Sequence, residues 1–172
     1  MRKTALTLFI AFGLAAAAAF AQTPDLSGEW KLNSGRSDLG DMAAADPSIT
    51  LSIRQEAGLI TIRKTISIVG REVVKNFRYT LDGKEALNAG ESLKELKGAA
   101  AFDKGILLVR SEQEGMTMTS TGVGEPEIEY FKYNSVEAFS LSADGKTLTL
   151  VHDQQMPDGA RRLTYVFEKL GS

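Results

Sequence analysis

Short segments in which apolar and polar residues alternate recur along most of this chain, separated by turns that contain glycine. In one such segment Ile49, Leu51 and Ile53 are spaced two apart, with polar residues between them. This period of two indicates a β-strand with one buried face. Asp-Gly pairs, which favour tight hairpin turns, occur at 82–83, 144–145 and 158–159. The pattern predicts an all-β chain of about eight or nine strands joined by sequential hairpins.

Many antiparallel strands in one sheet leave two edges whose backbone groups have no partner. Closing the sheet into a barrel removes those edges. Eight to ten strands enclose an interior just wide enough for side chains or one small ligand. A sandwich of two sheets is the physical alternative, but hairpins in unbroken order favour an antiparallel up-and-down meander closed into a barrel.

Residues 1–21 are typical of an export signal. Arg2 and Lys3 precede an apolar stretch, and Ala19-Phe20-Ala21 matches the small-x-small pattern of a cleavage site. The stretch is shorter than the ~20 residues of a membrane-spanning helix, so we expect cleavage after Ala21 and no stable membrane anchor. The localisation expected is periplasmic or extracellular.

The remaining residues, 22–172, suit a single domain with one core. The formal net charge is −2 and becomes −4 without Arg2 and Lys3. A mildly acidic chain without a basic run is a poor candidate for binding nucleic acid. The chain has no cysteine, so its stability must come from its core, and it has no thiol for catalysis or metal binding.

Two regions depart from the hairpin rhythm. Residues 34–48 form a long connection that could hold a short helix and act as a mobile lid over a barrel mouth. Residues 84–101 are ambiguous, because Ser92-Leu93-Lys94-Glu95 matches a helix capping box. We favour a strand from about Leu93 to Phe102.

Gly28-Glu29-Trp30, near the start of the expected mature chain, resembles the Gly-x-Trp signature of lipocalins and related barrels. More narrowly, the segments 25–33, 37–38 and 140–149 resemble a set of secreted bacterial proteins with a lipocalin-like, calycin-type barrel. The resemblance spans nearly all of residues 22–172 and implies a lipocalin-like fold.

The resemblance also implies how one end of the barrel is built. In that superfamily the tryptophan closes the barrel floor, and an arginine from a late strand packs over its ring. Gly28 and Trp30 would then form the floor here, and Arg161 or Arg162 could supply the cation–π contact.

Candidate residues for a ligand cavity are aromatic side chains of the expected strands, although half of them could belong to the core. They are Phe77, Tyr79, Phe131, Tyr133, Tyr165 and Phe167. His152, the only histidine, falls on the face of Leu148 and Leu150. It could orient a ligand or act as a base. It could also lie at the strand end near the rim, hydrogen-bonded or solvated, and we favour that interpretation.

Patterns for catalysis and cofactors are missing from the sequence. It has no Gly-x-Ser-x-Gly elbow, and one histidine makes a zinc site improbable. We therefore expect no metal, no cofactor and no enzymatic activity. The first hypothesis is a barrel that binds a small hydrophobic molecule. The second is a structural or protein-interaction domain of the cell envelope with a filled interior, and a barrel-based hydrolase or isomerase is a distant third. The oligomeric state stays open.

Overall fold

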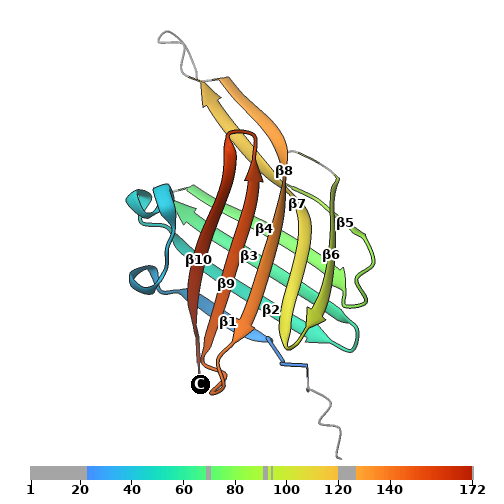
Figure 1. Ribbon diagram of the computed structural model, residues 1–172. Coiled ribbons are helices and arrows are strands. Elements are labelled where there is room, and N and C mark those ends of the chain that lie inside the picture. Colours follow the sequence, from blue (N-terminus) through green and yellow to red (C-terminus); the bar gives the residue numbers. More distant parts are fainter. Residues whose placement is uncertain (1–22, 69–70, 91–92, 94, 120–126, 172) are drawn as a thin grey trace, which may run out of the picture.

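Ten antiparallel strands wind into a nearly closed barrel in the computed structural model, which describes residues 23–171 except 69–70, 91–92, 94 and 120–126 (Figure 1). The predicted all-β meander is confirmed, with ten strands instead of eight or nine. The expected export signal lies outside the described residues. The strands are β1 (Gly28–Leu32), β2 (Ser48–Glu56), β3 (Leu59–Ile68), β4 (Arg71–Thr80), β5 (Ala86–Asn88), β6 (Leu96–Asp103), β7 (Ile106–Thr119), β8 (Glu127–Leu141), β9 (Thr147–Met156) and β10 (Gly159–Lys169).

The strand order explains how the barrel closes. The order is β4-β3-β2-β1-β10-β9-β8-β7-β6-β5, so β1 and β10 join the two ends of the chain. The outer strands β4 and β5 meet without a regular ladder, but the Arg78 N–H donates to Asn88 Oδ1 at 2.7 Å. A bridge between Asp82 and Ala101 joins them to β6 beyond the end of β4. The barrel therefore closes at this point through side-chain and turn contacts and not through a backbone ladder.

The two irregular regions resolve in different ways. The connection 34–48 contains two 3-10 helices, η1 (Ser34–Arg36) and η2 (Gly40–Ala45), so a short helical segment is present. A bridge between Asp38 and Thr164 ties this connection to β10. The region 84–101 forms β5 and then β6, which confirms a strand, although β6 starts at Leu96 and not near Leu93.

Trp30 lies at one end of the barrel and is completely buried. Its indole Nε1–H donates to the Leu26 carbonyl at 3.0 Å, so the polar atom of this core side chain is satisfied. Lys169 Nζ lies 5.2 Å from the ring centroid, within the range of a cation–π contact. Gly28 has a φ of +143°, and a Cβ there would come within 2.7 Å of Lys169 Cε. Glycine at this position lets the lysine cross to the tryptophan.

The expectation that Arg161 or Arg162 covers Trp30 is wrong. Trp30 is paired with Lys169 in the β1–β10 ladder, whereas both arginines are near the other end of β10. At about 3.3 Å per residue, strand geometry separates Arg161 from Lys169 by roughly 26 Å. Each arginine is exposed and bound to an aspartate, Arg161 to Asp158 and Arg162 to Asp153.

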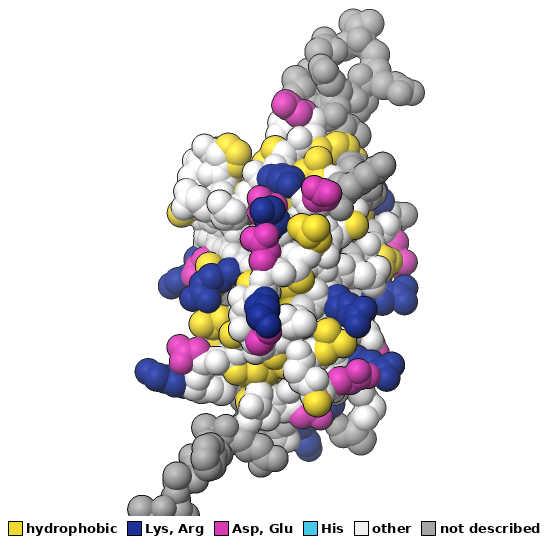
Figure 2. Space-filling model, turned by 90° about the vertical axis from the view of Figure 1, so that its right-hand side faces the viewer, with side chains coloured by type: hydrophobic (Ala, Val, Ile, Leu, Met, Phe, Trp, Pro, Cys, Tyr) yellow, Lys and Arg dark blue, Asp and Glu magenta, His cyan; other side chains and the backbone are white. Residues whose placement is uncertain are grey.

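Charged side chains on the outer surface are of both signs. Figure 2 shows lysine, arginine, aspartate and glutamate interspersed over the face in view, with single apolar side chains between them. No extended patch of one sign covers the described part of this face. The face in view therefore provides no electrostatic footprint for a polyanion.

Candidate functional site

Polar side chains gather inside the barrel on three neighbouring strands. Alternate residues of β7, β8 and β9 point inward, and the ladders place Ser111 opposite Ser135 and Glu137 opposite His152. Each of these inward residues is at most 8% exposed: Ser111, Gln113, Ser135, Glu137 and His152. Because buried polar groups cost free energy unless they are paired, a cluster of this kind is unusual in a purely structural core.

An ion pair crosses the barrel to this cluster. Lys64 on β3 donates to Glu137 Oε1 at 2.9 Å, and the two side chains are 13% and 5% exposed. Burial alone would raise the pKa of Glu137, but the Lys64 ammonium opposes it, and His152 and Lys75 add to its effect. The pKa of Glu137 therefore lies below its ordinary value. The carboxyl group is ionised at neutral pH.

Lys75 brings a second ammonium group to the same interior. It is the direct cross-strand partner of Lys64 in the β3–β4 ladder, and both side chains line one cavity. Like charges directly opposite each other in a ladder are unfavourable. Glu137 offsets this repulsion at Lys64.

His152 has a ring nitrogen that no described residue satisfies. The side chain is 4% exposed, and its Nδ1 lies 3.4 Å from the Gln154 Nε2. Its Nε2 is buried and has no hydrogen-bond partner in the described part of the chain. The expected position at the barrel rim is therefore wrong: the strand continues to Met156, and His152 packs against Tyr165 at 6.3 Å between ring centroids.

Burial controls the protonation of the rings around this cluster. It lowers the pKa of His152 to about 4, although the nearby Glu137 carboxylate opposes the shift, so the imidazole is neutral at pH 7. Burial, with a smaller contribution from Glu137, raises the pKa of Tyr165 to about 12. It also raises the pKa of Tyr79 and Tyr133. All three phenols keep their protons.

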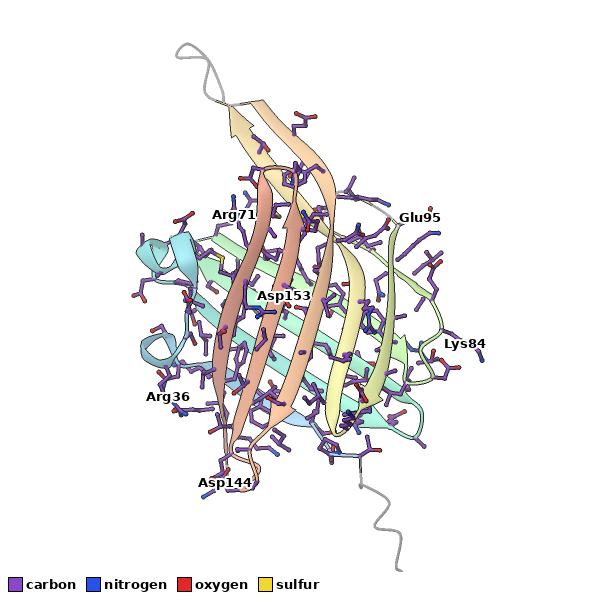
Figure 3. The ribbon with its side chains drawn as sticks, in the orientation of Figure 1. Arg36, Arg71, Lys84, Glu95, Asp144 and Asp153 are labelled. Atoms are coloured by element: carbon purple, nitrogen blue, oxygen red, sulfur yellow. The ribbon has the colours of Figure 1, made fainter. Side chains whose placement is uncertain are left out.

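A cavity of about 170 Å³ lies against His152, Tyr133 and Tyr165. Met42 on η2 forms part of its wall, so the cavity lies toward the end of the barrel that η2 covers. Figure 3 shows Arg71, at the start of β4, near that end and Asp144 at the opposite one. The described residues that line the cavity are Met42, Ile49, Lys64, Ile66, Lys75, Gln113, Tyr133, Leu150, His152, Gln154, Tyr165 and Phe167.

The structure brings some of the predicted cavity residues together and separates others. The predicted residues that line the cavity are Tyr133, His152, Tyr165 and Phe167. Phe77 and Tyr79 are instead stacked in the packed core, with centroids 6.3 Å apart. Phe131 is also placed elsewhere: it borders a separate hollow between the β7–β8 hairpin and the β9–β10 turn.

A larger hollow of about 390 Å³ lies on the outer surface of β8, β9 and β10. Its charged side chains are partnered, because Arg162 and Asp153 bind each other. It is open to solvent and has no orphaned polar group among its described residues. We therefore take the interior cavity as the candidate site.

Two negative findings concern the described residues alone. No group of three or more acidic, histidine or cysteine side chains is placed to hold a metal ion there. Within the same residues, no helix has the length and apolar character needed to cross a membrane.

Acidification is expected to destabilise the fold through His152. Its pKa is about 4 in the folded chain and 6.5 as a free side chain, so the unfolded state binds more protons between those values. Stability is complete above pH 6.5 and falls by about 3 kcal/mol as the pH drops to 4. The low pKa of Glu137 acts in the same direction below its own ordinary value of 4.5.

Urea unfolding at a series of pH values measures this dependence. The charged groups around the ring are Lys64, Lys75, Glu137 and Asp153, and all of them remain in a His152→Phe variant. That variant should lose most of the slope between pH 6.5 and 5. An equal slope in both proteins would contradict the assignment to His152.

No protein-family model matches this sequence, and no curated protein matches it. Solved structures, however, share its fold. The REP1-NXSQ fatty acid transporter superposes with a TM-score of 0.54 at 13% identity, over 86% of this chain and 98% of that one. The zebrafish ileal bile acid-binding protein complexed with cholic acid superposes with a TM-score of 0.52 at 16% identity, over 84% of this chain and 98% of that one. The fold is a lipocalin-like β-barrel.

The same fold also occurs in a protein whose name mentions no ligand. Secretory abundant heat soluble protein 4 from Ramazzottius varieornatus superposes with a TM-score of 0.53 at 13% identity, over 85% of this chain and 95% of that one. At such low identity the likeness concerns the fold, and function must be argued from the site.

Proposed function

We propose that this protein is exported and holds one small, mainly hydrophobic molecule inside its barrel, without catalysing a reaction. The observation that carries this proposal is the interior cavity of about 170 Å³, walled by aromatic side chains and by Met42 of η2. The names of the transporter and of the bile acid-binding protein on the same fold support a binding role. Entry would occur beside the connection 34–48.

Titration calorimetry with dodecanoate, retinol, benzoate, toluene and an anilinonaphthalene sulfonate dye tests the proposal. We expect saturable binding of at least one compound at about micromolar Kd, with a negative heat-capacity change because apolar surface is buried. A Leu150→Phe variant adds volume to the cavity wall and should bind more weakly. Leu141→Phe, on the same face at the far end of the barrel wall, is the control.

The second candidate is a structural or protein-interaction domain of the cell envelope. The observation in its favour is the cavity size, which is below the ~300 Å³ typical of ligand sites. Failure of every compound to bind would favour this candidate, and so would a compound whose affinity is the same in the Leu150→Phe variant, because it would bind outside the cavity.

Export predicts a definite mass for the secreted protein. Intact-mass measurement of the protein from the host's periplasm or medium should give a chain that begins at Gln22. A species that retains residues 1–21 and sediments with membranes would contradict cleavage and indicate an anchor.

A further inference from the structure

The cavity wall presents a hydrogen-bond donor at a fixed position. The Gln154 side-chain nitrogen can only donate, so His152 Nδ1 accepts its proton across 3.4 Å. A neutral imidazole that accepts at Nδ1 carries its hydrogen on Nε2. This buried N–H has no acceptor among the described residues, and leaving such a donor unsatisfied costs free energy. A molecule in the cavity with an oxygen acceptor could accept a hydrogen bond from this N–H.

The charges beside the cavity favour an acceptor that is negative. Lys64 and Lys75 both line it, on adjacent strands. Glu137 on β8 pairs with Lys64 and lies opposite His152 in the ladder, but its side chain is not among the described residues that line the cavity. An anionic group beside His152 in this cavity would be attracted by the ammonium groups of both lysines.

The volume limits the rest of the molecule. An engineered cavity of about 150 Å³ in another protein accommodates benzene, so 170 Å³ accommodates one ring with a small substituent. A long acyl chain would need the packed core around Phe77 and Tyr79 to open. The walls that such a ring would touch are Tyr133, Tyr165 and Phe167.

We propose that the cavity binds a compact organic carboxylate, about one aromatic ring in size, whose oxygen accepts a hydrogen bond from His152 Nε2. This inference rests on the proposed function and adds the chemical class of the ligand. Lys64 and Lys75 supply the favourable field, and the aromatic wall covers the ring.

Calorimetry on the protein without its signal segment compares benzoate, benzamide, toluene and dodecanoate. Benzoate should bind at least tenfold more tightly than toluene, because a hydrogen bond to a charged acceptor adds to the burial of the ring. Benzamide keeps an acceptor without the charge and should lie between them. Dodecanoate keeps the charge and exceeds the volume, so it should bind more weakly than benzoate.

Matched variants separate the hydrogen bond from the charge. His152→Phe keeps a ring and removes the donor, and should weaken benzoate binding about tenfold while leaving toluene unchanged. Lys75→Met should weaken benzoate more than benzamide. Lys146→Met removes the same charge at the exposed β8–β9 turn and should change neither. Fluorescence of Trp30, the only tryptophan, verifies that each variant is folded.

The single histidine also gives a direct readout, because its ring signals in a nitrogen-15 NMR spectrum need no assignment. Saturating benzoate should shift the Nε2 resonance, and toluene should shift it less. If His152→Phe fails to fold, this measurement on the unmodified protein decides the question, and an unmoved resonance at saturation overturns the inference.

The remaining outcomes are distinct. Equal affinity for toluene and benzoate would overturn the preference for a carboxylate. Tighter binding of dodecanoate than of benzoate would overturn the limit on ligand size. Either result would still leave a protein that binds a hydrophobic molecule. No binding of any compound, here or in the larger panel, would overturn the inference and the proposed function together.

Discussion

Replacing Trp30 with alanine is expected to lower the free energy of unfolding by about 3–5 kcal/mol, a large part of the stability of a domain this size. The ring is completely buried, so its removal leaves a cavity at the barrel floor. The change also leaves the Leu26 carbonyl without its indole donor and removes the cation–π contact of Lys169.

Chemical unfolding followed by far-ultraviolet circular dichroism measures this effect, since the variant has no tryptophan to report by fluorescence. Trp30→Phe keeps an aromatic face under Lys169 and should cost clearly less than Trp30→Ala. Lys169→Met tests the cation separately. Arg162→Ala should leave the midpoint nearly unchanged, because that arginine lies exposed on the outer surface. An equal loss in Arg162→Ala would contradict the placement of the floor.

The barrel was predictable because its signals are local. Alternation of apolar residues marks each strand, and Asp-Gly pairs mark turns, so the order of hairpins follows directly from the chain. The short strand β5 (Ala86–Asn88) was not predicted, because three residues are too few to show an alternating pattern. The capping-box pattern at 92–95 competed with the strand, and pairing with β7 decided for β6.

The lysine over Trp30 was not predictable from the resemblance, which directed attention to arginine. The residue that covers the ring is decided by register: Lys169 is the ladder partner of Trp30, and register between the first and last strands is a long-range property. Gly28 is the one local feature of the sequence that relates to this contact, because a residue without a Cβ leaves room for the lysine side chain.

The polar cluster could have been found in the sequence from the phase of its residues in each strand, although their polar character suggests an exposed position. Lys64 is in phase with Ile60, Ile62 and Ile66 of the same strand, so a period of two already places it on the buried face. Lys75 and Glu137 are likewise in phase with buried aromatic residues of β4 and β8. What the chain could not reveal is that the barrel brings Lys64 across to Glu137, which is 73 positions away.

Replacing Lys64 with methionine is expected to destabilise the protein by about 3–5 kcal/mol at pH 7, because it leaves the Glu137 carboxylate buried without its ammonium partner. Both side chains are largely buried, so water cannot replace the lost contact. A Lys64→Met/Glu137→Leu double variant removes both charges and should recover much of the loss, since a buried pair often replaces well with apolar groups.

A double-mutant cycle from urea unfolding isolates the coupling between the two side chains. The matched control is Arg54→Met, which breaks the exposed pair with Glu56 on β2 and should cost well under 1 kcal/mol. In Lys64→Met the loss should shrink as the pH falls, because protonation of Glu137 removes the uncompensated charge. Additive single-variant losses, or a loss independent of pH, would show that Lys64 and Glu137 do not stabilise each other inside the barrel.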